Sequence, residues 1–582
     1  MRVSLVGAEL DENLGIRYMA AALESRGHDV NIVPFNSEAD IASAVKSIMD
    51  FAPDVVGLSM VFTNRGREFC HLANVIRQEG FRGHLIAGGP FASFNYHHLL
   101  RDHSAIDSIA LGEGEVLICT LADNLDDLSK LPGLCYRKSN GTIEINPPGS
   151  GNDDLDSLPF PKRTELASFF DKKVASVLTS RGCWRNCAFC SINAWYDRVG
   201  GKKFRVRSIN SVVEEMKDLY RRHGVRIFNF QDDNFFLPDA NEALNRFEHL
   251  RDRLDKENVK EIAIAIKARP DSITRDSVAV LDDLGLFRVF LGVENASENG
   301  LRNLNRRSTV DQAIKALGIL NDFDIHIAYN LLIFEPDTTM EDIMTNLRFV
   351  ERNIENPFNF CRAEVHAGTG LETKLKAENR LLGDYFGLDY RLKDPQCEAF
   401  HQIANLAFYD RNFSDNGLHY FNMQVDFCFQ ILRRFNPEVL SQTLRGAVKN
   451  LIKQTNLDTY QYLCRIYDFV ESMDIRDNAT MWNFSKEIKA QVDVSSRNLH
   501  LQGGQILSWL EDSYREKSKL CHPINVVMTA YEDAKSFTAT DHNPNGSIEF
   551  GQSLALTQNI LTVPFMPIPY HIFKNKLAQG GG

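Results

Sequence analysis

Three cysteines carry the strongest chemical signal in the chain. Cys183, Cys187 and Cys190 are spaced C-x3-C-x2-C, and three thiolates are one fewer than a cubane iron–sulfur cluster needs. The missing ligand would leave one iron open to hold a small molecule. A zinc site is one alternative, but zinc would need a fourth His or Cys close by, and the nearest downstream are His223 and Cys361. Unrelated buried thiols are the other alternative.

The composition is that of a globular protein with ample core. The chain has 582 residues, of which 43% are hydrophobic and 24% charged, and a chain of this length is expected to form up to about four units. The net charge of −12 and the lack of a basic stripe argue against a nucleic-acid partner. No apolar run reaches the length of a membrane span, and the cysteines outside the motif show no paired spacing. We therefore expect a cytoplasmic protein in a reducing compartment.

Residues 1–145 alternate short apolar runs with helical stretches. Continuous apolar runs joined by helices are typical of a parallel sheet covered on both faces, and such strands here predict a doubly wound, flavodoxin-like α/β domain. The expected strands are Arg2–Ala8, Asp29–Phe35, Val55–Met60, His84–Gly89 and Ser108–Gly112. Ligands of such domains bind beyond the carboxyl ends of the strands, where the glycines Gly57, Gly88, Gly89, Gly112 and Gly114 fall.

A polar stretch rich in Pro and Gly, residues 146–171, is interpreted as a linker. Alternation resumes over residues 172–392, where further β/α units predict a partial TIM-type (β/α)6 barrel. The expected strands are Val174–Ser180, Arg226–Gln231, Glu261–Lys267, Arg288–Val293, His326–Phe334 and Asn359–His366. The cysteine motif begins where the first of these strands ends, which is the end at which this architecture places its chemistry.

Residues 393–582 lose the strand pattern. Pro437–Gln454, Thr459–Met473 and Gly504–Lys519 have helical periodicity, whereas the stretch from Asp541 onward has no convincing pattern. We expect this region to be a mainly helical accessory domain, and it offers no chemical clue.

The cysteine motif, with the aromatic Phe189 before its last member, resembles the cluster motif of the radical S-adenosylmethionine (SAM) superfamily. Further stretches follow in the order used by the barrel of that superfamily: Gly200–Ser208, Phe230–Phe236, Arg288–Asn295 and Ile333–Glu341. The N-terminal region resembles the cobalamin-binding domain attached to one branch of it, through Leu14-Gly15, Pro53–Ser59, Ala87–Pro90, Leu111–Glu115 and Pro132–Arg137. The resemblance covers residues 1–390 and implies a [4Fe–4S] cluster, SAM and cobalamin as cofactors.

By family analogy, polar residues at the ends of the barrel strands contact SAM, and Phe189 lies beside it. Asp232 and Asp233 occupy the place that contacts the SAM amino group, although they could equally cap a loop. Arg269 could pair with the SAM carboxylate, with a surface ion pair as the alternative. Glu294, at the polar end of an apolar strand, could accept hydrogen bonds from the ribose hydroxyls.

Many cobalamin domains of this kind carry a His after the first strand that ligates cobalt from below. Here Asn13 stands at that place, so the resemblance implies no imidazole ligand from this loop. Phe62, after the third strand, is expected to fill the lower face of the cobalt. The other residues expected to contact cobalamin are Leu14, Gly15, Ser59, Gly88, Gly89, Gly112, Glu113 and Gly114.

The resemblance implies a cobalamin-dependent radical SAM methyltransferase of the class B type. It would transfer a methyl group by way of methylcobalamin to an unactivated carbon, using a 5′-deoxyadenosyl radical. Three alternatives stay open: an enzyme with the same cofactors that catalyses ring rearrangement or cyclisation, a radical SAM enzyme without cobalamin, and a cobalamin carrier or sensor, against which the cysteine motif argues. By analogy, the substrate is a small-molecule or peptide natural product, and an external flavodoxin- or ferredoxin-type donor supplies single electrons.

Overall fold

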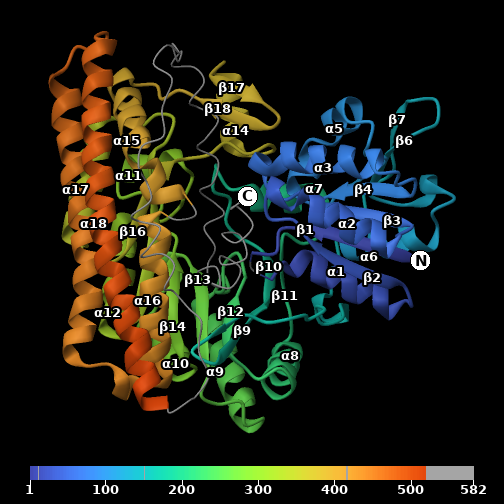
Figure 1. Cartoon of the computed structure of the whole chain (residues 1–582), viewed down its shortest axis with the longest axis horizontal. Coiled ribbons are helices and arrows are strands. Elements are labelled where there is room, and N and C mark those ends of the chain that lie inside the picture. Colours follow the sequence, from blue (N-terminus) through green and yellow to red (C-terminus); the bar gives the residue numbers. More distant parts are fainter. Residues whose placement is uncertain (11, 150, 415–416, 519–582) are drawn as a thin grey trace.

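The computed structural model describes residues 1–10, 12–149, 151–414 and 417–518. Its N-terminal part is a sheet in the order β2-β1-β3-β4-β5-β6-β7 (Figure 1). Parallel strands β1 (Arg2–Gly7), β2 (Asp29–Pro34), β3 (Val55–Ser59), β4 (His84–Gly88) and β5 (Ser108–Ala110) are followed by the antiparallel strands β6 (Leu134–Arg137) and β7 (Ile143–Ile145). The doubly wound α/β prediction is confirmed, and the β6–β7 hairpin is an addition that the sequence analysis missed.

Helices cover both faces of this first sheet. Helices α1 (Leu14–Ser25) and α6 (Gly114–Asp123) bury their apolar sides against one face. Helices α2 (Ile41–Phe51), α3 (Gly66–Gln78) and α5 (Tyr96–Asp102) pack on the other. Because both faces are covered, the ligand-accessible part of the sheet is the edge formed by the carboxyl ends of its strands.

The middle of the chain forms the expected partial barrel. The sheet runs in the order β16-β15-β14-β13-β12-β9-β8, so its outer strands β8 and β16 do not close on each other. Its parallel strands are β9 (Lys172–Val177), β12 (Val225–Phe230), β13 (Ala263–Ala268), β14 (Leu286–Leu291), β15 (His326–Phe334) and β16 (Phe358–Arg362). The antiparallel β8 (Ser168–Phe169) lies inside residues 146–171, which were interpreted as a linker. It pairs with β9 and forms the edge of the sheet, so the end of that stretch belongs to the barrel.

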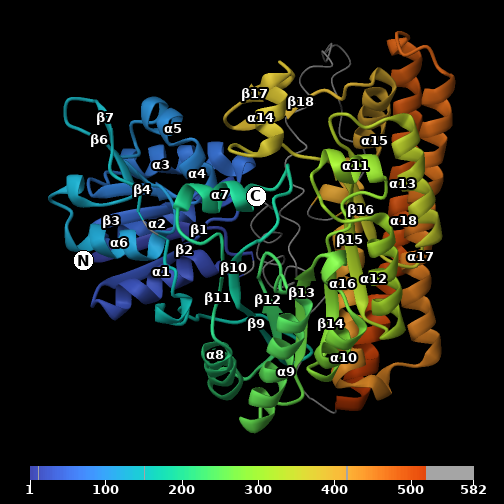
Figure 2. The ribbon, with the colours of Figure 1, turned by 180° about the vertical axis from the view of Figure 1, so that it is seen from behind.

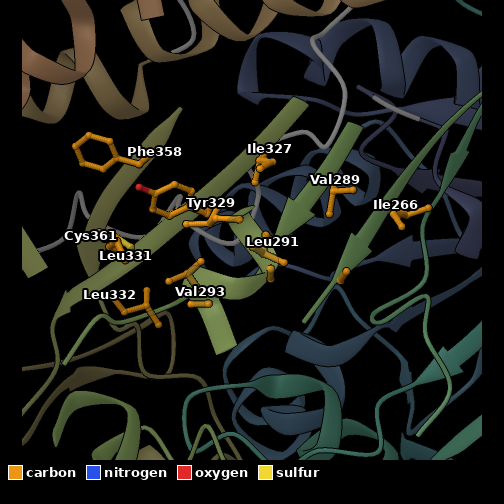
Figure 3. Close-up of a cluster of buried hydrophobic side chains, with 14 of the residues drawn as sticks. Ile266, Val289, Leu291, Val293, Ile327, Tyr329, Leu331, Leu332, Phe358 and Cys361 are labelled. Carbon is orange, nitrogen blue, oxygen red and sulfur yellow. The ribbon is translucent and has the colours of Figure 1, made fainter. Parts of the chain in front are cut away.

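Helices cover the outer face of the partial barrel. They are α8 (Ile209–Arg222), α9 (Ala240–Lys256), α10 (Arg275–Asp283), α12 (Val310–Asp322) and α13 (Met340–Arg352). The strands contribute alternate apolar side chains to the shared core, and Figure 3 shows Val289 and Leu291 of β14 lying near Ile327 and Tyr329 of β15. Cys361 belongs to the same buried cluster.

The C-terminal helices are longer than expected. They are α15 (Pro395–Phe413), α16 (Leu418–Phe435), α17 (Gln442–Ser472) and α18 (Asn478–Ser518). Pro437–Gln454 and Thr459–Met473 were expected as separate helices, but α17 runs through both. The polar residues between them do not break the helix, because the Asn456 side chain donates to Ile354 O at 2.7 Å and Asn356 O at 2.9 Å in the barrel.

The helix expected at Gly504–Lys519 is the last part of the much longer α18. Gly503 is tolerated inside α18 because Phe421 of α16 packs where a side chain would be, 2.7 Å from an added Cβ. The remainder of the accessory region, including the stretch from Asp541, lies outside the described residues.

Helix α16 is more than an accessory, because it fills the lower part of the barrel interior. Phe427 and Ile431 pack on the inner face of the sheet against Ile227 of β12 and Ala263 of β13. Phe427 is fully buried and meets Phe287 edge-on at 5.6 Å between ring centroids. In Figure 1 and Figure 2 the helix lies beside strands β13 and β14.

The barrel segment also reaches back to the first domain. A hairpin of β17 (Leu381–Asp384) and β18 (Gly387–Tyr390) packs its tip residues, Tyr385 and Phe386, into the core cluster that lies under α3 and α5. The Tyr385 ring stacks on His98 at 4.9 Å and Phe386 stacks on Phe91 at 5.8 Å. In the part of the chain described here, no helix is long and apolar enough to cross a membrane.

Replacing Phe427 with Ala should lower the melting temperature of the protein strongly. Truncating a buried Phe typically costs about 3–5 kcal/mol, and this ring joins the helical region to the barrel. Leu457→Ala on α17 is the matched control, since Leu457 is 42% exposed. Equal melting temperatures for the two variants would contradict the conclusion that α16 packs inside the barrel as part of its core.

Candidate active site

The cysteine motif lies on a loop between a short strand and a helix at the barrel mouth. Cys183 follows β10 (Ser180–Gly182), and Cys190 is the residue before α7 (Ser191–Val199). Gly182 has φ +86°, and a Cβ there would lie 1.8 Å from Lys203 O. Only glycine fits this turn, so the sequence fixes the direction in which the loop leaves β10.

The three thiols influence each other electrostatically. Burial raises the pKa of Cys190 to about 12, with further contributions from Cys187, Asp233 and Cys183. Burial also raises the pKa of Cys183, and Asp233 and Cys187 add to it. The raised pKa values hold Cys183 and Cys190 as protonated thiols, and a metal centre must displace those protons to bind them.

Cys187 is the most buried of the three, and cations surround its sulfur. It is 7% exposed. Arg306 Nη1 lies 3.3 Å from Cys187 Sγ, and Arg269 Nη1 lies 3.6 Å away. A buried thiolate needs compensating charge, and these guanidinium groups supply it. A thiolate-bound cluster therefore fits the residues present.

A single metal ion fits less well. Within residues 1–10, 12–149, 151–414 and 417–518, no group of three His, Cys, Asp or Glu side chains converges closely enough to hold one ion. A cubane cluster binds each thiolate to a different iron, so it accepts sulfurs that stand farther apart than the ligands of zinc do.

Asp232 and Asp233 have different environments. Asp232 is fully buried and accepts hydrogen bonds from the Thr179 backbone and hydroxyl, at 2.7 Å for the hydroxyl, and from Ser180 Oγ at 2.5 Å. It thus braces the chain just before the cysteine motif, and the bonds go to that segment and not to the loop after Asp233 that the alternative named. Asp233 accepts from Gly182 N at 3.1 Å. Burial raises its pKa, and the nearby cation Lys267 opposes the rise.

Arg269 is not on the surface, as its alternative proposed, but is buried beside Asp271 and Cys187. Its Nε donates to Asp271 Oδ1 at 2.9 Å, and its Nη2 donates to Arg306 O at 2.8 Å. These contacts hold the guanidinium at the cluster loop. Contact with the SAM carboxylate stays a prediction.

Glu294 has an unusual backbone at the end of β14. Its φ is +66°, and its main chain bonds to Asn330 O at 3.1 Å and Leu332 N at 2.5 Å in β15. A non-glycine residue in this region carries strain that the neighbouring strand must hold. The carboxylate lies 3.5 Å from Arg306, and burial raises its pKa while Arg306 and Arg269 lower it. The strained turn directs a carboxylate toward the cations of the cluster loop.

Arg306 and Asn234 were missed by the sequence analysis as site residues. Arg306 is buried, follows α11 (Glu298–Asn303) and bridges Glu294, Cys187 and Gly292 O. Asn234 is 1% exposed, and neither polar atom of its side chain has a partner among the described residues. Asn234 follows β12 at the end where chemistry is expected, which was the available signal, whereas Arg306 lies beyond α11 and had no such signal.

The residues expected to contact cobalamin gather at the carboxyl edge of the first sheet. Ser59 pairs in register with Gly88, and Gly89 has φ +92° with Met60 O 2.9 Å from where a Cβ would be. An added Cβ on Gly88 would lie 3.4 Å from Ala110 Cβ, so both glycines allow the chain segments at this edge to pack closely. Phe62 is half-buried just before the short helix Thr63–Arg65. Contact of these residues with cobalamin stays a prediction.

Other predicted cobalamin residues have packing roles. Leu14 is buried in the first turn of α1, and Gly15 follows it there. Gly114 gives Met19 of α1 room against α6, because an added Cβ would lie 2.5 Å from Met19 Sδ. Asn13 caps α1 with Oδ1 accepting from Ile16 N at 3.3 Å, so this side chain belongs to the helix start.

Glu113 joins the two domains. It pairs with Arg205 at 2.6 Å and with Arg181 at 3.1 Å, and Arg181 also pairs with Glu115 at 2.6 Å. Arg181 lies two residues before Cys183 in the cluster loop. Burial alone would raise the pKa of Glu113, but Arg205 and Arg181 hold it below its usual value.

Helix α7 also lies against the edge of the first sheet. Its last residue, Val199, is 3.5 Å from the position of a Cβ on Gly112, whose φ is +124°. Trp195 meets Phe94 edge-on at 6.5 Å. Figure 2 shows α7 next to α4 (Pro90–Phe94). The helix that starts at the last motif cysteine therefore forms part of the contact between the domains.

Comparison with known families agrees with this architecture. The model of the radical SAM superfamily matches residues 177–350, and that of the B12 binding domain matches residues 8–122. An uncharacterized methyltransferase of Pyrococcus horikoshii is 28% identical over 382 residues, which are 63% of this chain and 79% of the relative. An anaerobic magnesium-protoporphyrin IX monomethyl ester cyclase of Synechocystis is 27% identical over 326 residues, 54% of this chain and 62% of the relative.

A solved structure shares the fold over most of the chain. The cobalamin-dependent SAM radical enzyme OxsB, with aqua-cobalamin bound, superposes with a TM-score of 0.63 at 15% identity and covers 89% of this chain and 80% of its own. A B12-binding domain followed by a radical SAM domain defines the class. The chain belongs to the cobalamin-dependent radical SAM enzymes, whose cofactors are a [4Fe–4S] cluster, SAM and cobalamin.

Replacing Arg306 with Gln should lower the reduction potential of the reconstituted cluster. Loss of a positive charge at Cys187 disfavours the more negative reduced state, and an interaction of about 1 kcal/mol shifts a one-electron couple by about 40 mV. A redox titration followed by electron paramagnetic resonance measures the shift. Arg302→Gln, on the exposed side of α11, is the control, and equal potentials in both variants would refute the charge-compensating role.

Replacing Glu113 with Gln should weaken domain docking at pH 7, because it leaves Arg181 and Arg205 without their shared carboxylate. Breaking a buried pair in this way costs about 3–5 kcal/mol. Since the pKa of Glu113 is depressed, its contribution is present above the usual value of 4.5 and is lost as the pH falls through the lowered pKa. The difference in melting temperature between wild type and variant should therefore shrink below that pH. The exposed Glu341→Gln is the control, and a difference that grows on acidification would contradict the ion pair.

Proposed function

We propose that the protein is a cobalamin-dependent radical SAM methyltransferase that acts on an unactivated carbon of a natural-product substrate. The observation that carries the proposal is the packing of α7. The helix begins directly after Cys190 and ends with Val199 against Gly112, at the edge proposed to hold cobalamin. One rigid helix thus connects the source of a radical to the proposed source of a methyl group.

When bound, the cluster and SAM supply a carbon radical, and cobalamin supplies a transferable methyl group. The residues of this chain hold and orient these groups. Arg306 and Arg269 compensate charge at Cys187, and Asp233 and Glu294 offer carboxylates to the amino group and ribose of SAM. Arg269 and Arg306 are buried, which keeps water from weakening their interaction with Cys187.

The first loop favours methyl transfer. The Asn13 side chain caps α1 and donates from Nδ2 to Ala8 O at 3.1 Å, and it offers no imidazole to cobalt. Phe62 is the proposed apolar neighbour of the lower face. A weakly ligated cobalt gives up a methyl group to a carbon radical more readily. The similarity to a relative named a methyltransferase points the same way.

Ring rearrangement or cyclisation is the second candidate. The similarity to a magnesium-protoporphyrin ester cyclase, at nearly the same identity as the methyltransferase relative, favours it. Both candidates use the same residues at the cluster loop and need an external one-electron donor, which we propose to be of the flavodoxin or ferredoxin type. They differ in the fate of the SAM methyl group.

Labelled SAM separates the candidates. With SAM carrying a ¹⁴C-methyl group, reductant and substrate candidates of natural-product type, methyl transfer requires label in the product together with S-adenosylhomocysteine and 5′-deoxyadenosine. Cys187→Ala should form neither nucleoside product, because the remaining thiolates hold the cluster poorly. If the wild type forms only 5′-deoxyadenosine and methionine, methyl transfer is wrong and the rearrangement or cyclisation candidate takes its place.

A further inference from the structure

The inner face of the barrel changes character along its height. Low in the barrel it is apolar, where Ile227 of β12 and Ala263 and Ala265 of β13 pack against α16. Side chains on one face of a strand recur every second residue. The next residues of the same faces are therefore Asn229 of β12, Gln231 directly after the end of β12, and Lys267 of β13. We call these three residues the polar shelf.

Asn229 is the unusual member of the shelf. It is 1% exposed, and neither Nδ2 nor Oδ1 has a hydrogen-bond partner among the described residues. A buried amide without partners is costly to the folded state. Its neighbours on the same strand face are the apolar Ile227 below and the polar Gln231 above, so a ligand at the upper side is the partner that its position offers.

Gln231 and Lys267 are already joined. Lys267 Nζ donates to Gln231 Oε1 at 3.2 Å, which fixes the orientation of the amide and leaves its NH2 group as a donor. The shelf therefore combines an ammonium group with the NH2 groups of two amides. Donors outnumber acceptors, and a cation lies among them, which is the pattern that recognises an oxyanion.

The shelf lies directly below the proposed SAM site. Gln231 precedes Asp232 and Asp233, and Lys267 precedes Arg269, whose guanidinium reaches Cys187. Two residues along a strand span about 6.6 Å. A small molecule held on the shelf would therefore have its reacting carbon within a few bonds of the cluster loop.

We propose that the polar shelf binds an anionic group of the substrate, a carboxylate or a phosphate-type oxyanion. The proposal deepens the proposed function, since it takes the inner face of the barrel as the substrate side. Lys267 also contributes to the environment of Asp233. A role confined to that carboxylate is the competing account, and the test separates it from substrate anchoring.

The test is a direct titration that does not depend on turnover. The full chain, reconstituted with cluster and cobalamin and saturated with S-adenosylhomocysteine, is titrated calorimetrically at fixed ionic strength with acetate, methylphosphonate and the neutral acetamide. We expect the wild type to bind at least one anion more tightly than acetamide. Which anion binds better tells carboxylate from phosphate-type substrates.

Lys267→Gln should weaken anion binding at least about tenfold, the equivalent of one charge-assisted contact, and Lys267→Arg should restore most of it. Asn229→Leu should also weaken it. Lys315→Gln, exposed on α12, is the control. Iron content and the corrinoid spectrum report whether each variant holds its cofactors; should Lys267→Gln lose them, Asn229→Leu and Lys267→Arg decide.

Anion affinity within twofold of wild type in Lys267→Gln, or binding of both acetate and methylphosphonate no tighter than that of acetamide, would overturn the proposal. So would a loss of S-adenosylhomocysteine affinity with unchanged anion affinity, which would assign Lys267 to Asp233 alone. If anions bind the polar shelf but no labelled methyl group reaches a product, the anion-binding proposal is supported and only the proposed methyl transfer is contradicted.

Discussion

The contact between Cys187 and the guanidinium groups of Arg306 and Arg269 is the interaction on which the active site depends. A thiolate that is 7% exposed cannot be charged without partners. Arg306 in turn pairs with Glu294, and Arg269 with Asp271. Residues of the cluster loop and residues that follow β13 and β14 therefore all contact the sulfur of Cys187 or the cations beside it. Displacement of any of these segments would expose the sulfur to water or remove its compensating charge.

The same loop also sets the relation between the domains. Arg181 lies two residues before Cys183 and pairs with Glu113 and Glu115 of the first domain, while α7 follows Cys190 onto the edge of the first sheet. The β17–β18 hairpin packs Phe386 against Phe91 of α4, the helix whose Phe94 meets Trp195 of α7. With these contacts, the first domain has little freedom to move away from the barrel mouth, as a reaction between two bound cofactors requires.

Much of the fold was predictable because parallel strands that are buried on both faces consist of continuous apolar residues. His326–Phe334 was predicted to the residue, and the strands of the first sheet were placed within two residues. The short antiparallel strands β6, β7, β8, β17 and β18 were missed, since their pairing is decided by neighbours and not by their own pattern. The unbroken α17 was missed because the partners of Asn456 are in the barrel, about a hundred residues earlier in the chain.

The candidate site was predictable only in part, for a related reason. Cysteine spacing is local, so the motif was visible in the sequence. The partner of Cys187, Arg306, is 119 residues away, and the partners of Glu113 belong to another domain, so only folding brings them together. Asp232 was visible as a polar strand end, but the sequence could not show that Thr179 and Ser180 use its carboxylate.

The central claim is that the three thiolates hold a cluster with one iron open to SAM. Electron–nuclear double resonance of the reduced, reconstituted protein with SAM labelled by ¹⁷O in its carboxylate and ¹⁵N in its amino group tests it most directly. The account predicts hyperfine coupling of both labels to the cluster. A cluster signal that does not change when labelled SAM is added would contradict it.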